Sequence, residues 1–421
     1  MIAKLQSNRV RRTYLGGGRI DAFTGGARAQ VTTDNVGRAP SPCQSDTFRQ
    51  SGKDEGVLAT ECGRLQGPST GCGCDMPRPE DWLASTTTAF NGTLEIEGEG
   101  LGRLEDGRLV KDVVGTLPIL VKLLDSDERL VIQAHPTVPC AKRLFNSPVG
   151  KTECWYFLPG MAPDACVYLG FKPGITREAW EEAVRAGIED RRQKTDDRRD
   201  VEKSKSRSAC RMSHVACPNP AADAQERAPP AAGAINCAPP AMLSYLHRIP
   251  VAAGDFVFVD GGMPHAIGGG CFMIELQEPS DLMVVAERVT PSGRRIPDAK
   301  MLGGVGWEKM FDVYEYGGMT FEETCAKYVR KCSQMSNVHK SALSTNVNIN
   351  QICGKELTDK FEMWRVTGGG RVTLPRDRSV AVVTDGEGAV NGHEVAKGDR
   401  LLIAEESQIA VAGSVTLIVC V

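Results

Sequence analysis

Short apolar runs of strand length, separated by turn residues, restrict the fold of this chain most strongly. Leu117–Leu124 and Leu130–Ala134 are bounded by Gly, Pro and an Asp-Ser-Asp segment, and further runs follow at Gly254–Val259 and Phe272–Gln277. Apolar runs of this length that end at such residues are typical of β-strands packed in a sheet. We therefore expect a mainly β protein.

The last hundred residues repeat the same pattern. Ser379–Thr384 and Leu401–Ala404 are strand-length runs, and Gly398-Asp399 stands before the second run as Gly254-Asp255 stands before an earlier one. No histidine follows Gly398-Asp399 in the sequence. We expect residues 320–421 to form a second, smaller β-barrel-like domain that binds no metal.

Helical patterns are few. Thr176 is a candidate helix N-cap, and Trp180, Val184 and Ile188 recur at intervals of four residues, which predicts one amphipathic helix. A short helix or turn is expected within Pro77–Phe90.

Two stretches contain too few large apolar side chains to bury a core. Residues from about 27 to 75 are rich in Gly, Ser, Thr and Asp, and residues from about 190 to 239 combine mixed charge with Pro and Ala. Such composition is typical of disordered segments. We interpret both as inserts in a domain that spans residues 1–319.

Composition excludes several classes of partner. The 421 residues carry 50 basic and 53 acidic side chains, a formal net charge of −3, so no general attraction to nucleic acid or to an anionic membrane is expected. No run of 18 apolar residues occurs, and the basic N-terminus lacks the apolar segment of a signal peptide. We expect a cytoplasmic protein.

Fifteen cysteines are scattered along the chain, an odd number that does not suit a disulfide framework. Cys62, Cys72 and Cys74 form the densest group, but no fourth ligand follows at the spacing of a zinc ribbon. We expect most of the thiols to be reduced.

Metal-ligating residue types gather in two stretches. Gln133 and His135 are two residues apart, so an extended strand would project both from one face, and Glu153 follows after a loop. His265 follows a Gly-Asp strand and a glycine turn. Two imidazoles, a carboxylate and an amide oxygen suit a divalent ion such as zinc, with a position left open for substrate or water.

Three segments carry a resemblance to a known family. They are Gln133–Pro136, Gly150–Trp155 and the stretch from Gly254-Asp255 to His265–Gly268. They resemble class I mannose-6-phosphate isomerases, particularly the shorter bacterial-type forms. The resemblance implies a cupin-type β-barrel (jelly roll) catalytic domain with a small helical part. It also implies one Zn²⁺ per chain and reversible isomerisation of D-mannose 6-phosphate and D-fructose 6-phosphate through an enediol(ate). The metal ligands that it implies are Gln133, His135, Glu153 and His265.

Two lysines match family positions that hold the substrate phosphate or transfer protons. Lys122 interrupts an apolar run, and Lys151 lies two residues before Glu153. Lys151 is the first candidate for proton transfer, because burial near a cation lowers the pKa of a lysine, and Glu275 is the second. Lys122 is expected to contact the phosphate.

The chain departs from the family at two positions. Relatives carry an arginine four residues after the aspartate that matches Asp281, and this chain has Val285 there. We expect Arg288, three residues later, to take its role in catalysis and phosphate binding. Many relatives also carry a phosphate-contacting serine where this chain has Val131.

Two alternative functions remain open at this point. Two histidines and one carboxylate are also the ligand set of non-haem iron oxygenases, although Gln133 would fill a position that such chemistry needs open. A degenerate, non-catalytic sugar-phosphate-binding protein is the second alternative, and Val285 supports it. The expected partner is a small phosphosugar, and the expected state is a monomer or homodimer.

Overall fold

The computed structural model describes residues 1–25, 76–91, 96–188, 240–334, 339–340, 347–405 and 408–421. Strands dominate this part of the chain and form three antiparallel sheets, so the prediction of a mainly β fold is confirmed. Each sheet is an open series of strands rather than a closed barrel. The two predicted inserts, 27–75 and 190–239, lie outside the described residues.

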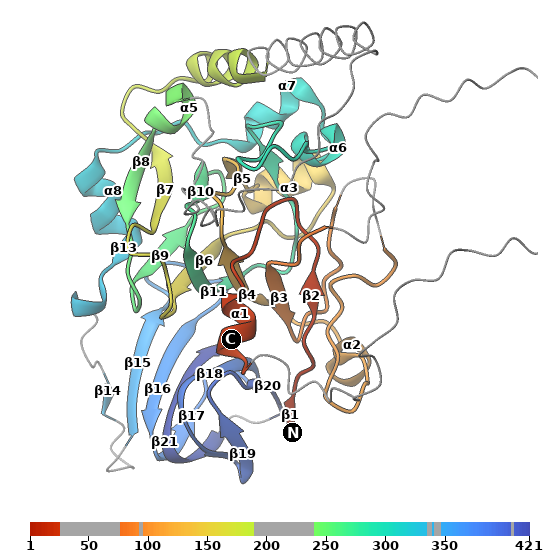
Figure 1. The fold of residues 1–421 in the computed structure, drawn as a ribbon, viewed down its shortest axis with the longest axis vertical. Helices are drawn as coiled ribbons and strands as arrows, with labels where there is room; N and C mark the ends of the chain where they lie inside the picture. Colours follow the sequence, from red (N-terminus) through yellow and green to blue (C-terminus); the bar gives the residue numbers. More distant parts are fainter. Residues whose placement is uncertain (26–75, 92–95, 189–239, 335–338, 341–346, 406–407) are drawn as a thin grey trace, which may run out of the picture.

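A seven-stranded sheet forms the centre of the molecule (Figure 1). In spatial order its strands are β13 (Val329–Arg330), β9 (Phe256–Val259), β6 (Glu153–Phe157), β11 (Cys271–Gln277), β4 (Leu120–Ser126), β3 (Glu80–Leu83) and β2 (Arg9–Val10). Strands β4, β6 and β11 are buried along their whole length, including the charged residues Lys122, Glu153 and Glu275.

The helix or turn expected within residues 77–90 is partly wrong. Glu80–Leu83 form strand β3, which pairs with β2 and β4 and is buried at all four positions. Pairing with a central strand determines the conformation here, and the local sequence carries no alternating pattern that would have indicated it.

A five-stranded sheet supplies the other half of the predicted site. Its order is β12 (Val284–Val285), β5 (Gln133–Ala134), β10 (His265–Ile267), β7 (Cys166–Phe171) and β8 (Leu246–Pro250). The strand expected over residues 130–134 is reduced to two residues. The segment before β5 is fixed by the carboxylate of Glu287. Buried Arg129 donates two hydrogen bonds of 2.7 Å to this carboxylate, and the Ile132 N–H donates a third at 2.8 Å.

The third sheet contains most of the C-terminal residues. Its main path is β1 (Ile2–Lys4), β20 (Arg400–Ala404), β18 (Arg378–Val390), β21 (Gln408–Cys420), β16 (Met363–Gly368), β15 (Val347–Cys353) and β14 (His339–Lys340), with β17 (Gly370–Thr373) on β21 and β19 (His393–Ala396) on β18.

Each of the two predicted domains contributes a strand to a sheet of the other. N-terminal β1 pairs with β20, whereas β13 pairs with β9 of the seven-stranded sheet. Trp155 and Phe258 from the seven-stranded sheet belong to the same buried apolar cluster as Phe361 and Cys420. The division at residues 319 and 320 stays a prediction.

Helices lie mainly at the end of the molecule opposite the third sheet (Figure 1). They are α1 (Arg19–Phe23), α2 (Val110–Val114), α3 (Val138–Phe145), α5 (Pro240–Ser244), α6 (Asp298–Met301), α7 (Trp307–Met310) and α8 (Phe321–Tyr328), with 3₁₀ turns η2 (Phe311–Val313) and η3 (Cys332–Gln334). Residues 177–188 are also helical. The Thr176 hydroxyl caps them by accepting from the Ala179 N–H at 3.2 Å, and Trp180 and Val184 are fully buried, as predicted.

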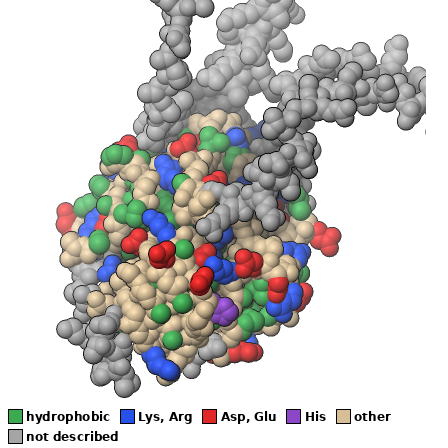
Figure 2. All heavy atoms as spheres, turned by 60° about the horizontal axis from the view of Figure 1, so that its bottom comes forward, with side chains coloured by type: hydrophobic (Ala, Val, Ile, Leu, Met, Phe, Trp, Pro, Cys, Tyr) green, Lys and Arg blue, Asp and Glu red, His purple; other side chains and the backbone are tan. Residues whose placement is uncertain are grey.

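Charges of both signs are interspersed on the face shown in Figure 2. Among the described helices, none is long and apolar enough to cross a membrane. The cysteines within the described residues are free thiols, and most of them are buried.

Candidate metal centre

Strand register brings one row of functional side chains onto a single face of the seven-stranded sheet. Glu275 on β11 is paired with Lys122 on β4 and with Trp155 on β6, and Lys122 is paired in turn with Trp82 on β3. Directly paired residues project to the same face, and so do residues two apart along a strand. Glu153, two before Trp155, therefore lies on this face too.

A second row belongs to the five-stranded sheet. Gln133 on β5 is paired with His265 on β10 and with Val285 on β12. His135 follows β5, two residues beyond Gln133, as the predicted alternation required. The site thus lies between two sheets, with Glu153 from one and both histidines from the other.

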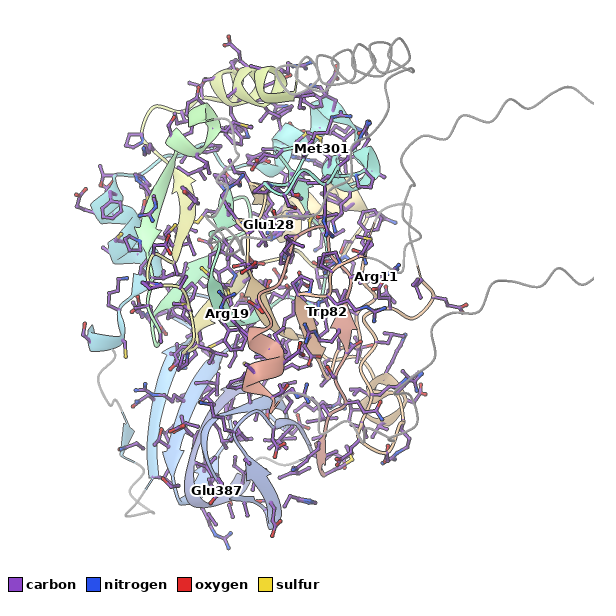
Figure 3. The ribbon with its side chains drawn as sticks, viewed as in Figure 1. Arg11, Arg19, Trp82, Glu128, Met301 and Glu387 are labelled. Carbon is purple, nitrogen blue, oxygen red and sulfur yellow. The ribbon has the colours of Figure 1, made fainter. Side chains whose placement is uncertain are left out.

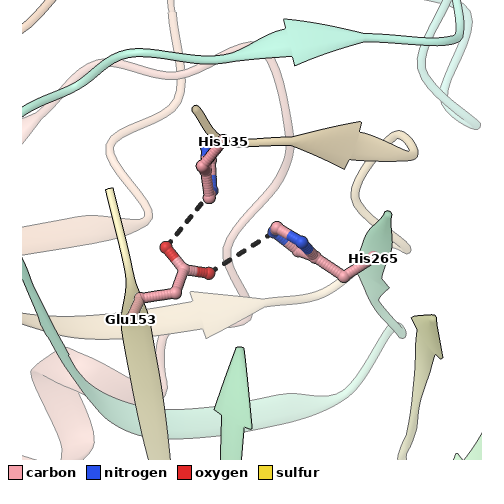
Figure 4. A group of neighbouring side chains, drawn as sticks. All are labelled: His135, Glu153 and His265. Carbon is pink, nitrogen blue, oxygen red and sulfur yellow. Dashed lines mark ion pairs between the residues drawn. The ribbon is translucent and has the colours of Figure 1, made fainter. Parts of the chain in front are cut away.

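The three ligand types converge as predicted. The Glu153 carboxylate lies between the two imidazoles, with Oε2 3.2 Å from Nε2 of His135 and Oε1 3.4 Å from Nε2 of His265 (Figure 4). One ligand atom from each residue lies within 4.8 Å of the others, and all three residues are buried. Within the described residues, no other group of three or more His, Cys, Asp or Glu side chains has this geometry.

Both imidazoles are oriented by backbone carbonyls. Nδ1 of His135 is 2.9 Å from the Leu282 carbonyl oxygen, and Nδ1 of His265 is 2.9 Å from that of Met263. A carbonyl can only accept, so each Nδ1 carries the proton and each Nε2 presents its lone pair to the site. Burial and the charge of Lys151 lower the pKa of His135 to about 3, and burial also lowers the pKa of His265. Both are therefore neutral at pH 7, as metal ligands must be.

Gln133 also reaches the site. Its Nε2 lies 3.2 Å from Nε2 of His265. The predicted role as a ligand requires the amide to be turned so that Oε1 faces the site, since an amide nitrogen is not a metal ligand.

Lys151 contacts the predicted ligands directly. Its ammonium donates to Nε2 of His135 at 2.6 Å and to Oε2 of Glu153 at 2.7 Å, and it lies 3.8 Å from Oε1 of Glu275. The sequence prediction that Lys151 points into the site is in accord with these contacts. Its role in proton transfer stays a prediction.

Lys122 and Glu275 form the next buried pair. The ammonium of Lys122 lies 3.3 Å from Oε1 of Glu275 and 3.8 Å from Oε2 of Glu80. Burial raises the pKa of Glu275 to about 7 even though Lys122 opposes the shift, and the charge of Glu153 adds to it. A carboxyl group with this pKa exchanges protons readily near neutral pH.

Arg288 is not brought to the site. Its guanidinium donates to the exposed carboxylate of Asp298 at 2.6 Å, and Arg288 is absent from the cavity lining. The preceding residue, Glu287, points inward to Arg129. Because successive side chains of an extended segment point to opposite faces, the side chain of Arg288 points away from the cavity. The role expected for Arg288 therefore has no support in its position.

A different arginine, which the sequence did not indicate, lies at the site. Arg12 is buried and donates to Oε1 of Glu80 at 2.9 Å and, through both terminal nitrogens, to Asp281 at 3.1 Å. Its guanidinium carbon and the Lys122 ammonium lie 5.0 and 5.1 Å from the ring centre of Trp82, which Figure 3 labels on β3. Arg12 and Asp281 are 269 residues apart, so no local pattern could have paired them.

These residues line one cavity. It has a volume of about 610 Å³ when its open mouth is included. The charged and polar lining residues are Arg12, Thr13, Tyr14, Glu80, Lys122, Gln133, Lys151, Glu153, Glu275, Asp281, Thr290 and Lys300.

Sequence comparison finds relatives over part of the chain. A segment of 164 residues, 39% of this chain, is 26% identical to mannose-6-phosphate isomerase ManA of Bacillus subtilis and to the mannose-6-phosphate isomerase of Streptococcus mutans. It spans 35% and 34% of those proteins, about a third of their length. No protein-family model matches the sequence.

Structural comparison covers the whole chain. The mannose 6-phosphate isomerase from Bacillus subtilis aligns over 100% of this chain and 99% of its own, with a TM-score of 0.59 and 15% identity. The apo form of the Salmonella typhimurium enzyme gives a TM-score of 0.57 with 12% identity over 100% and 98%. A mannose 6-phosphate isomerase bound with zinc and yttrium gives 0.52 with 12% identity over the same shares. This chain has the fold of the mannose-6-phosphate isomerases and resembles them in sequence over part of its length.

Proposed function

We propose that this protein is a metal-dependent aldose-ketose isomerase that interconverts D-mannose 6-phosphate and D-fructose 6-phosphate. The observation that carries the proposal is the buried group of His135, Glu153 and His265, with Lys151 and Glu275 beside it in one cavity. The comparisons add support, because proteins with this fold and with a related sequence are named as mannose-6-phosphate isomerases.

The residues present fit a divalent ion, and zinc is the one we propose. His135 and His265 offer neutral nitrogens of fixed orientation, and Glu153 offers a carboxylate between them. Gln133 would complete the set through Oε1. The zinc-bound structure of similar fold favours this choice. When bound, the ion supplies Lewis-acid polarisation of a carbonyl oxygen.

Lys151 and Glu275 are proposed to move the protons. In the open-chain aldose, the Glu275 carboxylate takes the proton from C2 while the Lys151 ammonium gives a proton to the oxygen on C1, which leaves an enediol. Glu275 then returns its proton to C1, and Lys151 takes the proton from the hydroxyl on C2, which becomes the ketone. Both groups end in their starting state. Their separation of 3.8 Å lets them act on adjacent atoms.

Lys151 has contacts that change when a metal binds. Its ammonium now donates to Nε2 of His135 and Oε2 of Glu153, the atoms that the ion requires. If these two atoms held a cation, neither could accept a hydrogen bond from Lys151, and the Lys151 ammonium would be repelled from them. Glu275 is the other carboxylate within 4.0 Å of the Lys151 ammonium, so the proposed proton-transfer pair would remain in contact.

The test is a coupled assay of mannose 6-phosphate conversion on purified protein with its metal content measured. We expect activity that a chelator removes and zinc restores. Glu153→Gln should lose both bound metal and activity, whereas Glu394→Gln, an exposed carboxylate on β19, should lose neither. Bound metal without turnover in the unmodified protein would contradict the proposal. Oxygen consumption with Fe(II) would then favour the oxygenase, and its absence would favour a sugar-phosphate-binding protein.

A further inference from the structure

Lys300 is a buried cation that lacks an anionic partner. It lies on α6 and is only 5% exposed, yet within the described residues no carboxylate oxygen lies within 4.0 Å of its ammonium. Its one side-chain hydrogen bond is a long one, 3.4 Å, to Oδ1 of Asn91. Buried lysines are ordinarily paired, because an uncompensated charge in the interior is costly.

The nearby acids are already engaged. Asp281 accepts hydrogen bonds from both terminal nitrogens of Arg12. Glu80 accepts hydrogen bonds from the side chains of Arg12, Tyr14 and Trp82. Burial first, and then the charge of Arg12, lower the pKa of Lys300 to about 8. Lys300 therefore remains mainly charged at pH 7 without a partner that would explain its burial.

Arg12 and Lys300 converge on one acceptor. Nη1 of Arg12 donates to Oδ1 of Asn91 at 3.1 Å, the same atom that Lys300 contacts. Four of the five N–H groups of Arg12 are used by Glu80, Asn91 and Asp281, which leaves one on Nη2. Both residues line the cavity that holds Glu153 and Lys151.

The charge of the cavity favours an anion at this end. The lining contains four cations (Arg12, Lys122, Lys151 and Lys300) and four carboxyl groups (Glu80, Glu153, Glu275 and Asp281). Glu275 is partly protonated near pH 7, and Glu153 is assigned to the metal ion, which adds positive charge. Apolar lining residues such as Leu130 and Ile296 lower the local polarity and strengthen the attraction.

We propose that Lys300, supported by Arg12, binds the phosphoryl group of the substrate in the part of the cavity that these two residues line. This assignment rests on the proposed function. It makes Lys300 a specificity-determining residue that selects phosphorylated over neutral sugars. A compact ammonium suits a phosphate oxygen, and the remaining N–H of Arg12 adds a second donor.

The experiment uses the full-length, metal-loaded protein with inorganic phosphate as the probe. We expect phosphate to bind to the unmodified protein in calorimetry and to inhibit competitively. Lys300→Met should weaken phosphate binding at least tenfold and raise KM for mannose 6-phosphate by a similar factor, with kcat changed much less. Lys300→Arg should retain part of the affinity. Lys309→Met, which removes an exposed lysine on helix α7 outside the cavity, is the matched control and should change neither quantity.

A second measurement excludes a purely structural role. Since Lys300→Met removes an unpaired buried charge, its Tm should stay equal or rise while phosphate affinity falls. Should Lys300→Met not fold, Lys300→Gln gives the same comparison. Unchanged phosphate affinity and KM in an active Lys300 variant would overturn this assignment and leave the isomerase proposal standing. Phosphate binding that depends on Lys300 in a protein without turnover would support the anion site and overturn the isomerase proposal.

Discussion

Lys122 and Glu275 face each other across strands β4 and β11, with the ammonium nitrogen 3.3 Å from a carboxylate oxygen, and both side chains are buried. Burial acts on the two groups in opposite directions. It raises the pKa of Glu275 to about 7, whereas for Lys122 the charges of Glu275 and Glu80 outweigh burial and raise the pKa above its ordinary value. Near neutral pH, Lys122 therefore stays charged while Glu275 changes its protonation state.

Glu275→Gln is expected to lower kcat about 10² to 10⁴-fold, the range for loss of a general base. The base must be ionised to act, so in the unmodified protein kcat/KM should rise with pH and level off above the pKa of Glu275. That pKa is about 7, and a bound divalent cation shifts the midpoint below it. The residual activity of Glu275→Gln should lack this rise. A rise with the same midpoint in Glu275→Gln would assign the titration to another group.

Burial of His135 predicts how the stability of chelated protein depends on pH. The folded state takes up a proton at His135 only near pH 3, whereas an unfolded histidine does so near pH 6.5. The unfolded state therefore binds more protons between these values, and the free energy of unfolding falls as pH falls through this window. Urea unfolding at pH 7.5 and pH 5 should show the loss. His135→Gln should reduce it, while His393→Gln, at an exposed position on β19, should not.

The sequence indicates the group of His135, Glu153 and His265 as a candidate metal site because these residues follow local rules. Gln133 and His135 share a face through strand alternation, and His265 follows a recognisable strand and turn. Trp180 and Val184 revealed their helix through its period in the same way. In each case the information lies within a few neighbouring residues.

The anion end of the cavity could not be predicted in this way. Arg12 lies on no periodic pattern, and Lys300 lies on the four-residue helix α6, which is too short to show one. Their positions depend on contacts with Asp281 and Asn91, which are distant in sequence. Arg288 was preferred because it lies near Val285 in sequence, but proximity along the chain does not fix the direction of a side chain after a two-residue strand.

Asp281→Asn should be strongly destabilising. It removes one of two buried carboxylates from Arg12 and leaves Glu80 as its only charged partner. Loss of hydrogen bonding to a buried charged group typically costs about 1.5 to 3 kcal/mol. Asp298→Asn offers a comparison, because it removes the partner of Arg288 from a pair whose carboxylate is exposed, and about 0 to 1 kcal/mol is usual for pairs in contact with solvent. Urea unfolding of both variants should show this contrast. Equal losses would mean that the buried network around Arg12 is not a main source of stability.

Gly150 is expected to couple packing to metal binding. A Cβ at this position would lie 2.6 Å from the Pro136 carbonyl oxygen and 2.9 Å from the Val138 amide nitrogen, both backbone atoms. Gly150→Ala must therefore push apart the segments that carry His135 and Lys151, at a cost of about 1 to 3 kcal/mol. Gly317→Ala is the control, because a Cβ there meets nothing within 4 Å and its φ is not in the left-handed region. We expect Gly150→Ala to weaken zinc binding in calorimetry and to lower Tm, and Gly317→Ala to do neither. Normal zinc affinity in a destabilised Gly150→Ala protein would show that the ligand geometry tolerates movement of this loop, and would separate the stability of the turn from the function of the site.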